Sequence, residues 1–168
     1  MPHLRIGQGI DFHRLSADIR AGLRLGGITV PAEKGAVGHS DADVLLHAIC
    51  DALLGAAALG DIGTHFPDTD PAWKGIDSRI LLEQTVNLVH QSGYEVCNLD
   101  CTVCLQAPKI KPYIPAMCQE IARILGVHPN QVSIKATTTE HLGFIGREEG
   151  VAAMAIVLLT AAPAAPQA

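Results

Sequence analysis

The sequence predicts an α+β fold, with a single mixed β-sheet and helices layered on one face of it. Segments with the period of two that is typical of strands alternate with helical segments, in the order strand, strand, helix, helix, strand, helix, strand, strand. With 168 residues the chain has the length of one domain, which we place at residues 1–160, followed by a disordered Ala/Pro tail at 161–168. Helices on one face leave the other face bare, and we expect another copy of the chain to cover it.

The composition restricts the classes of function. Hydrophobic residues make up 48% of the chain and charged residues 17%, so the core has to be built from Leu, Ile, Val and Ala. A net charge of -5 without runs of Lys or Arg argues against nucleic acid as a partner. The chain has no apolar stretch of membrane-spanning length and no signal peptide, so we expect no membrane association and a cytoplasmic location with reduced cysteines.

The first predicted strand covers residues 4–12 and contains Gly7 and Gly9. The pair is similar to the start of a dinucleotide-binding motif, but no third glycine and no helix follow it. We therefore expect these glycines to allow a close backbone approach or a bulge. Short strands around a Gly-Gly turn are predicted within residues 20–30, and a loop is predicted at 32–39.

The first predicted helix begins after Ser40 and runs to about residue 59. Ser40 is a favourable N-cap, and Asp43 three residues later completes a capping box. Asp43, His47 and Asp51 then repeat every four residues and share one face of the helix. Such a polar stripe is either a solvated face or part of a functional site.

The second half of the chain continues the alternation of elements. They are, in order, an irregular acidic loop at 61–71, a helix at 77–91, a strand at 95–106, a loop at 107–112, a helix at 115–125, a strand at 132–138, a Gly-rich loop at 139–150 and a strand at 151–160. Cys97, Cys101 and Cys104 have a spacing similar to that of an iron–sulfur motif. The period of two puts Cys101 and Cys104 on opposite faces of the strand, which argues against a cluster. We expect the cysteines to be mostly core-facing.

Three side chains form a candidate metal site. Asp11 and His13 are two residues apart in extended chain and therefore point to the same side, and His47 lies in a helical segment rich in Asp and His. Two imidazoles and one carboxylate are a common catalytic zinc set, and iron or manganese would also suit them. The alternative is that the three are unrelated surface side chains.

A second candidate site follows the strand at 132–138. The threonines at 137–139 offer hydroxyl and backbone donors to phosphate oxygens, and Glu140 suits a hard cation such as magnesium. The alternative is an edge strand that is rich in Thr for its β-propensity alone.

Six motifs occur together in one order. They are Asp11-x-His13, His39-Ser-Asp-x-Asp up to His47, Gly60-Asp-Ile-Gly, Phe66-Pro-Asp-Thr-Asp-Pro71, Gln106-Ala-Pro-Lys109, and Ala136-Thr-Thr-Thr-Glu140-x-Leu-Gly-Phe144. In this combination the sequence resembles the 2-C-methyl-D-erythritol 2,4-cyclodiphosphate synthase family of the non-mevalonate isoprenoid pathway, from about residue 4 to residue 160.

The resemblance implies a phosphorus–oxygen lyase that converts 4-diphosphocytidyl-2-C-methyl-D-erythritol 2-phosphate to the 2,4-cyclodiphosphate and CMP, through metal-assisted attack of the 2-phosphate on the β-phosphate. It implies that Asp11, His13 and His47 hold zinc and that Glu140 holds magnesium or manganese. The implied substrate-binding residues are His39, Ser40, Asp61, Gly63, Phe66, Asp68 and Asp70. The implied nucleotide-binding residues are Leu105, Lys109, Ile110, Lys111, Ala136, Thr137 and Thr138. We expect His39 and Ser40 to meet an anion at the N-terminus of the helix.

The resemblance also implies a homotrimer with active sites between adjacent chains. Phe144, Arg147 and Glu149 match residues of a central cavity that holds an isoprenoid diphosphate in some family members. Glu148 stands where the family commonly has Gly.

Two other functions use the same trio of metal ligands. A zinc hydrolase would activate water with it, but would need an open water path and a general base. A trimeric scaffold with a structural metal would need four protein ligands, and the sequence shows three.

Overall fold

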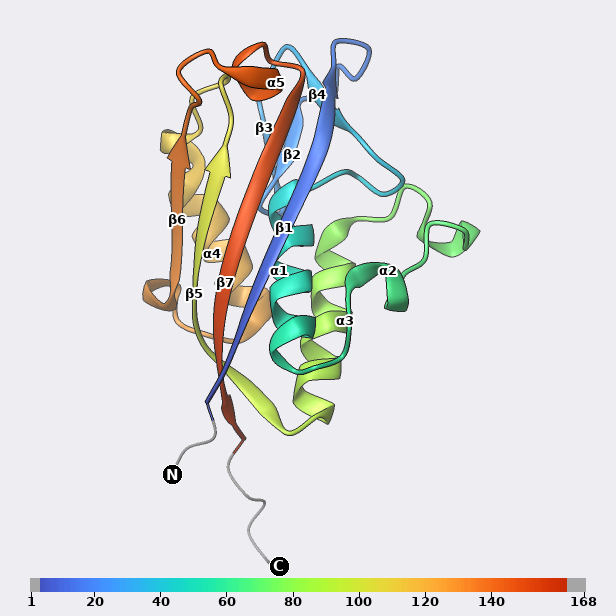
Figure 1. Ribbon diagram of the computed structural model, residues 1–168, viewed down its shortest axis with the longest axis vertical. Helices are drawn as coiled ribbons and strands as arrows, with labels where there is room; N and C mark the ends of the chain where they lie inside the picture. Colours follow the sequence, from blue (N-terminus) through green and yellow to red (C-terminus); the bar gives the residue numbers. More distant parts are fainter. Residues whose placement is uncertain (1–3, 163–168) are drawn as a thin grey trace, which may run out of the picture.

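The computed structural model describes residues 4–162 and is built around one five-stranded mixed sheet (Figure 1). Its strand order is β4-β1-β7-β5-β6, with only β5 and β6 parallel. The strands of this sheet are β1 (Leu4–Ser16), β4 (Gly35–Val37), β5 (Tyr94–Cys104), β6 (Val132–Thr137) and β7 (Gly150–Ala161). A separate hairpin is formed by β2 (Leu23–Leu25) and β3 (Ile28–Val30).

The main helices are α1 (Val44–Ala56), α3 (Ser78–Gln91) and α4 (Ile114–Leu125), which lie on one side of the sheet (Figure 1). The predicted α+β architecture is therefore confirmed. Shorter helical turns are α2 (Ile62–His65), α5 (Gly143–Gly146), η1 (Pro71–Trp73), η2 (Lys111–Tyr113) and η3 (Pro129–Gln131). Within residues 4–162, no helix is long and apolar enough to cross a membrane.

Several predicted boundaries were wrong. The predicted loop at 32–39 contains β4, which pairs with the end of β1. The loop at 61–71 contains α2 and the first residue of η1, and the loop at 139–150 contains α5. Ala161, the first residue of the predicted tail, still belongs to β7, and residues 163–168 of that tail lie outside the described part of the chain.

The glycines of β1 let the sheet approach α1 closely. A Cβ at Gly7 would lie 2.0 Å from the carbonyl oxygen of Ala52, and one at Gly9 would lie 2.0 Å from that of Ala48. Neither distance is compatible with a side chain, so the predicted close approach is confirmed and only glycine fits at either position. The same face of β1 carries Asp11, two residues further along, which is thereby held beside α1.

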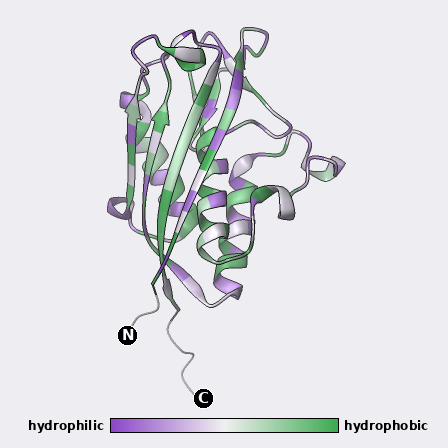
Figure 2. Cartoon of the chain, in the orientation of Figure 1, coloured by the Kyte–Doolittle hydropathy of each residue, from purple (hydrophilic) through white to green (hydrophobic). Residues whose placement is uncertain are grey.

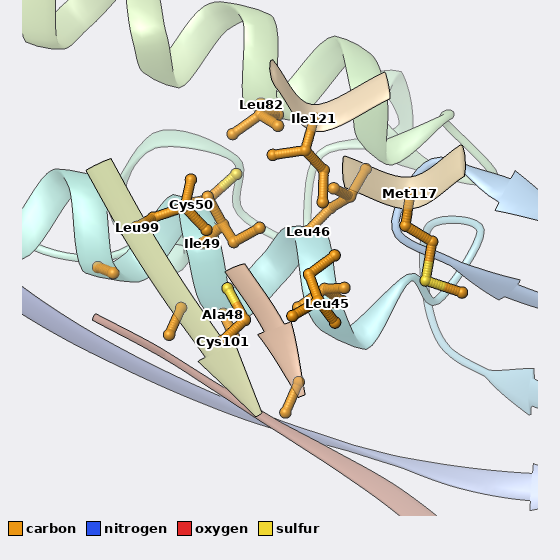
Figure 3. Close-up of a cluster of buried hydrophobic side chains, with 14 of the residues drawn as sticks. Leu45, Leu46, Ala48, Ile49, Cys50, Leu82, Leu99, Cys101, Met117 and Ile121 are labelled. Atoms are coloured by element: carbon orange, nitrogen blue, oxygen red, sulfur yellow. The ribbon is translucent and has the colours of Figure 1, made fainter. Parts of the chain in front are cut away.

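The core lies between α1 and the surrounding elements (Figure 3). Leu46 and Ile49 of α1 are fully buried, as are Leu82 of α3 and Ile121 of α4. Figure 2 shows that α1 and β7 are largely hydrophobic, as expected for the helix and the strand at the centre of the molecule. Burying one such side chain contributes about 1.5–3 kcal/mol, so this core fixes α1 against the sheet.

The first helix begins later than predicted. Its N-cap is Asp43, not Ser40, and the Asp43 carboxylate accepts hydrogen bonds from the backbone N–H groups of Leu46, Gly26 and Gly27 at 2.7–3.1 Å. The predicted capping box was therefore wrong. The fully buried carboxylate instead joins α1 to the β2–β3 turn.

A β-bulge interrupts the regular alternation of β5 between Val96 and Asn98. It removes Cys97 from the core face, so Val96 and Leu99 are buried whereas Cys97 is only partly buried. Cys50 and Cys101 are buried, and Cys104 and Cys118 are partly exposed. The prediction that Cys101 and Cys104 lie on opposite faces is confirmed. Cys118 packs against the core although it is only partly buried, so the prediction of mostly core-facing cysteines holds for three of the five and was wrong for Cys97 and Cys104.

The sheet face away from the helices carries exposed aliphatic and aromatic side chains on β1 and β7. Ile6 is 73% exposed, and Ile10, Phe12 and Ile156 are each exposed by about half. β1 and β7 are neighbours with Gln8 opposite Ile156, so these side chains form one surface, which we call the outer apolar face. An apolar surface of this kind typically marks an interaction site.

Candidate metal centre and adjoining cavities

The candidate metal centre joins β1 to α1. The Asp11 carboxylate oxygen Oδ2 lies 3.1 Å from His13 Nε2 and 3.0 Å from His47 Nδ1, and these two ring nitrogens are 3.0 Å apart. Among the described residues, this is the cluster of His, Cys, Asp or Glu side chains able to hold a metal ion. The trio predicted from the sequence is thus brought together.

The geometry of the cluster fits a small divalent cation. Bonds of about 2.0–2.1 Å in tetrahedral geometry separate neighbouring ligand atoms by about 3.3 Å, close to the three observed separations. The set of two nitrogens and one carboxylate oxygen matches catalytic zinc sites, in which a fourth position stays open. Side-chain exposures of 12–27% show that the ligands are partly shielded from water while one side remains accessible.

The ionisation of the cluster favours metal binding by its carboxylate. Burial alone would raise the pKa of Asp11, but its close polar contacts and charge interactions with His13 and His47 outweigh burial and hold the pKa well below its usual range. Burial would lower the pKa of His13, yet its hydrogen bond and charge interaction with Asp11 raise it. Without a cation, the carboxylate is therefore charged and is stabilised by the two imidazoles.

A cavity of about 430 Å³ opens beside the cluster, and His13 and His47 form part of its wall. Five of the predicted substrate-binding residues also line it, namely His39, Ser40, Gly63, Phe66 and Asp68. Its apolar wall includes Trp73 and Leu81, which the sequence did not indicate. Trp73 stacks edge-on against Phe66, with ring centroids 5.2 Å apart.

Two predicted substrate-binding carboxylates lie outside the lining of this cavity. Asp61 caps α2 and accepts hydrogen bonds from the backbone N–H and the hydroxyl of Thr64, both at 2.8 Å. These two hydrogen bonds lower the pKa of Asp61. Asp70 caps η1 through the backbone N–H of Ala72. Both side chains shape the loop that carries Phe66.

The expected anion site at His39 and Ser40 remains a prediction, but the structure places these two residues before α1 and not at its first turn. The Asp43 carboxylate accepts a hydrogen bond from the N–H of Leu46 in the first turn of that helix, and a second anion beside it would be repelled. His39 and Ser40 precede the helix by several residues and reach the cavity from a loop.

A second cavity, of about 190 Å³, lies where β5 and β6 end. Its lining includes all seven predicted nucleotide-binding residues and, in addition, Gln106 and Pro108. The seven are Leu105, Lys109, Ile110, Lys111, Ala136, Thr137 and Thr138. The parallel pairing of β5 with β6 brings these two segments of the chain together.

The predicted site residues not yet described lie between Glu140 and Glu149, just after the cavity-lining threonines in the sequence. Glu140 lies apart from the metal cluster, and its carboxylate accepts a hydrogen bond from the Thr138 hydroxyl at 3.1 Å. Arg147 and Glu149 form an ion pair with two contacts of 3.0 Å, and the Phe144 ring packs 6.2 Å from that of Phe12 on the outer apolar face. Glu148 has a φ of +57°, a conformation that glycine adopts without strain.

No role was predicted from the sequence for two residues beside the metal cluster, Ser78 and Asp41. His47 Nε2 lies 2.9 Å from the hydroxyl oxygen of Ser78, and this hydroxyl donates to the Asp41 carboxylate. Ser78 begins α3, and nothing in the local sequence of that helix relates it to a histidine thirty-one residues earlier.

The chain is similar to known proteins over nearly its whole length. The profile of the YgbB family matches residues 4–160. The 2-C-methyl-D-erythritol 2,4-cyclodiphosphate synthase of Syntrophobacter fumaroxidans is 58% identical over 156 residues, which are 93% of this chain and 97% of that protein.

Solved structures agree with this similarity. The bifunctional IspDF of Campylobacter jejuni has a TM-score of 0.91 and 42% identity, and the match covers 96% of this chain and 43% of that longer chain. A Plasmodium falciparum IspF in complex with CDP has a TM-score of 0.83 and 34% identity, with 95% of this chain and 97% of that chain covered. The chain belongs to the YgbB family of 2-C-methyl-D-erythritol 2,4-cyclodiphosphate synthases.

Proposed function

We infer that the chain carries out the reaction of its family. It converts 4-diphosphocytidyl-2-C-methyl-D-erythritol 2-phosphate to 2-C-methyl-D-erythritol 2,4-cyclodiphosphate and CMP. An oxygen of the 2-phosphate forms a bond to the β-phosphorus, and the bond from that phosphorus to the oxygen shared with the α-phosphate breaks, so CMP leaves with the electron pair. The observation that carries this assignment is the cluster of Asp11, His13 and His47 on the wall of the larger cavity.

The chain has to bring two anionic groups of the substrate together. Like unit charges 4 Å apart repel by about 4 kcal/mol at an effective dielectric constant of 20, and the protein itself is acidic, with a net charge of -5. Asp11, His13 and His47 would hold zinc, and Glu140 would hold magnesium or manganese. When bound, such cations neutralise phosphate charge and polarise the phosphorus–oxygen bonds.

The remaining contribution of the protein is positioning. His39, Ser40, Gly63, Phe66 and Asp68 would hold the methylerythritol phosphate in the larger cavity, with Asp61 and Asp70 shaping its loop. The seven residues of the second cavity would hold the cytidine and its phosphates. Holding the reacting atoms in line can lower the barrier by roughly 7–11 kcal/mol, so no nucleophile from the protein is needed.

Phosphorus NMR of the purified protein with the diphosphocytidyl substrate, zinc and magnesium tests this function. We expect signals of the cyclic diphosphate and of CMP. Linear phosphate products would instead identify a hydrolase, and unchanged substrate would favour a scaffold with a structural metal.

We propose that the functional unit is a homotrimer with one active site between each two adjacent chains. The outer apolar face supports this, because it exposes Ile6, Ile10, Phe12 and Ile156 on one side of the sheet. In a single chain, β7 and β5 separate β1 from β6, so the metal cluster and the second cavity lie on different parts of the sheet. A neighbouring chain would supply the nucleotide cavity to each metal cluster.

Sedimentation equilibrium tests the assembly. We expect the wild-type protein to have the mass of three 17.7-kDa chains and Ile156→Lys, on the outer apolar face, to dissociate. Ile80→Lys on α3 is the matched control, since Ile80 is 42% exposed and Ile156 is 47% exposed. A monomeric wild-type protein would refute the trimer.

Two finer expectations remain predictions. Phe144, Arg147 and Glu149 would line a central cavity of the trimer that takes an isoprenoid diphosphate, which titration calorimetry with such a ligand would detect. The cytoplasm is the expected compartment.

A further inference from the structure

The second ring nitrogen of His47 makes contacts that the proposed reaction does not use. While Nδ1 faces Asp11 and the metal cluster, Nε2 lies 2.9 Å from Ser78 Oγ and 3.1 Å from Ser40 Oγ. A neutral imidazole carries its proton on one nitrogen and has a lone pair on the other. The partners of Nε2 therefore determine whether Nδ1 can bind a cation.

Ser78 is the partner of Nε2 that remains in place. It is fully buried, and its hydroxyl donates to Asp41 Oδ1 at 2.5 Å. Because its single proton goes to a carboxylate, the oxygen of Ser78 can only accept from His47, and this requires the proton on Nε2. The resulting tautomer leaves the Nδ1 lone pair free to bind a cation.

Ser40 is less suited to this role. It is only partly buried, lines the larger cavity, and its oxygen also accepts from the backbone N–H of Ala42 at 3.2 Å. A bound substrate would compete for its hydroxyl. Ser78 does not line that cavity.

Asp41, which accepts the hydrogen bond from Ser78, is itself held in place. The other oxygen of Asp41, Oδ2, lies 3.3 Å from Arg24 Nε, and Arg24 also donates to the Thr29 hydroxyl at 3.1 Å. The backbone N–H of Asp41 donates to the Ile76 carbonyl at 3.0 Å, which fixes the distance from Asp41 to the start of α3. The carboxylate therefore has a fixed position from which to orient the Ser78 hydroxyl.

We propose that Ser78 is a positioning residue of the metal centre and that, together with Asp41 and Arg24, it holds His47 in the Nε2-protonated tautomer. Ser78 touches neither the cation nor the substrate and acts through the imidazole. Partners of this kind typically change metal affinity by about 10- to 100-fold when they are removed. The inference rests on the proposed role of His47 as a metal ligand.

The test is the affinity for zinc alone, measured by competition with a chromophoric chelator and without substrate. We expect Ser78→Ala to bind zinc about 10- to 100-fold more weakly than the wild type and Ser78→Thr, which keeps the hydroxyl, to recover most of the affinity. Ser92→Ala is the matched control. Ser92 ends the same helix, and its exposed hydroxyl donates only to the Leu88 carbonyl. Its affinity should equal that of the wild type.

A spectroscopic measurement on the wild-type protein decides the question even if Ser78→Ala does not fold. Nitrogen-15 NMR of the zinc-loaded protein should show His47 protonated on Nε2. A proton on Nδ1, or unchanged zinc affinity in a folded Ser78→Ala, would overturn the role of Ser78. Zinc retained by His47→Ala would instead refute the ligand assignment itself, so the two failures are distinguishable.

Discussion

The metal cluster and the nucleotide cavity differ in how completely the chain builds them. Asp11, His13 and His47 come from the middle of a strand and from a buried helix, and their polar atoms already contact one another. The second cavity is formed by strand ends and a loop, and its side chains of Lys109, Thr137 and Thr138 are exposed. The first region is preorganised, whereas the second requires a ligand or a neighbouring chain to exclude water.

The difference indicates how each region gains affinity for its ligand, the cation at the metal cluster and the nucleotide at the second cavity. A cluster held by close packing loses little conformational entropy when a cation binds, so its precision depends on the core beneath it. An exposed cavity at strand ends gains affinity from charges and backbone donors that tolerate small movements. Substitutions should therefore have large effects in the first region and graded effects in the second.

The largest effect is expected for His47→Ala. Removing one of three ligands should abolish stoichiometric zinc binding and lower kcat/KM by roughly 10³-fold or more, because the partners of ligands already contribute 10- to 100-fold. Metal analysis and steady-state kinetics measure both, and His90→Ala, an exposed histidine on α3, is the control. Full zinc occupancy in His47→Ala would remove His47 from the ligand set.

Two glycine substitutions compare how tightly the chain is packed beside the metal cluster and in the segment that follows the nucleotide cavity. Gly9→Ala places a Cβ 2.0 Å from the Ala48 carbonyl oxygen, which should lower the free energy of unfolding by about 3 kcal/mol and weaken zinc binding by displacing β1. Gly143→Ala has no atom within 4 Å of its Cβ and a φ of +65°, so it should cost about 1 kcal/mol. Chemical denaturation measures the free energy of unfolding of both variants. Equal losses of stability would contradict the difference in packing between the two regions.

A smaller effect is expected at the second cavity. Lys109→Ala removes one exposed charge beside the proposed phosphate site, so KM should rise about 10-fold with little change in kcat, as expected from roughly 1.4 kcal/mol of lost binding. Added salt should reduce the difference between variant and wild type. Lys74→Ala is the control, since Lys74 is exposed and lines neither cavity. A fall in kcat without a change in KM would show that Lys109 acts in the chemical step.

The smallest effect concerns the N-cap of α3, next to Ser78. Hydrogen bonds from Arg79 lower the pKa of Asp77 against the opposing effect of burial. A carboxyl group whose pKa is lowered in the folded state stabilises the fold at pH values above its unfolded-state pKa of about 4. This stabilisation is lost as the pH falls through the folded-state pKa. Asp77→Asn keeps a capping oxygen, so we expect less than about 1 kcal/mol of destabilisation at pH 7.

Thermal unfolding measured from pH 3 to pH 8 checks this prediction. The difference between Asp77→Asn and the wild type should be constant above pH 5 and shrink in acid. A difference that grows in acid would contradict the sign of the shift.

The sequence predicted those elements whose signals are local. The period of two in β5 and the helix predicted at 115–125 both correspond to observed structure. The start of α1 was wrong because Asp43 is fixed by the amides of Gly26 and Gly27, which are distant in sequence. β4 was missed because its three residues form a strand only by pairing with β1.

The site could be predicted only as far as residue types and spacing carry its chemistry. Asp11, His13 and His47 are typical metal ligands and were found directly. Ser78 was not, because a serine at the start of a helix has an ordinary local explanation and its role follows from contact with His47 alone. Trp73 was missed for the same reason, since only the folded loop places it in the cavity wall.

The antiparallel pairing of β1 with β7 has a consequence for protein engineering. Leu4 lies opposite Thr160, so the two ends of the described chain meet at one end of the sheet, where β1 and β7 run side by side (Figure 1). Neighbouring ends of this kind tolerate fusion and circular permutation. A short linker between them, with new ends opened at an exposed loop remote from the site, such as that around Gly126, should yield a permuted enzyme whose metal centre is unchanged.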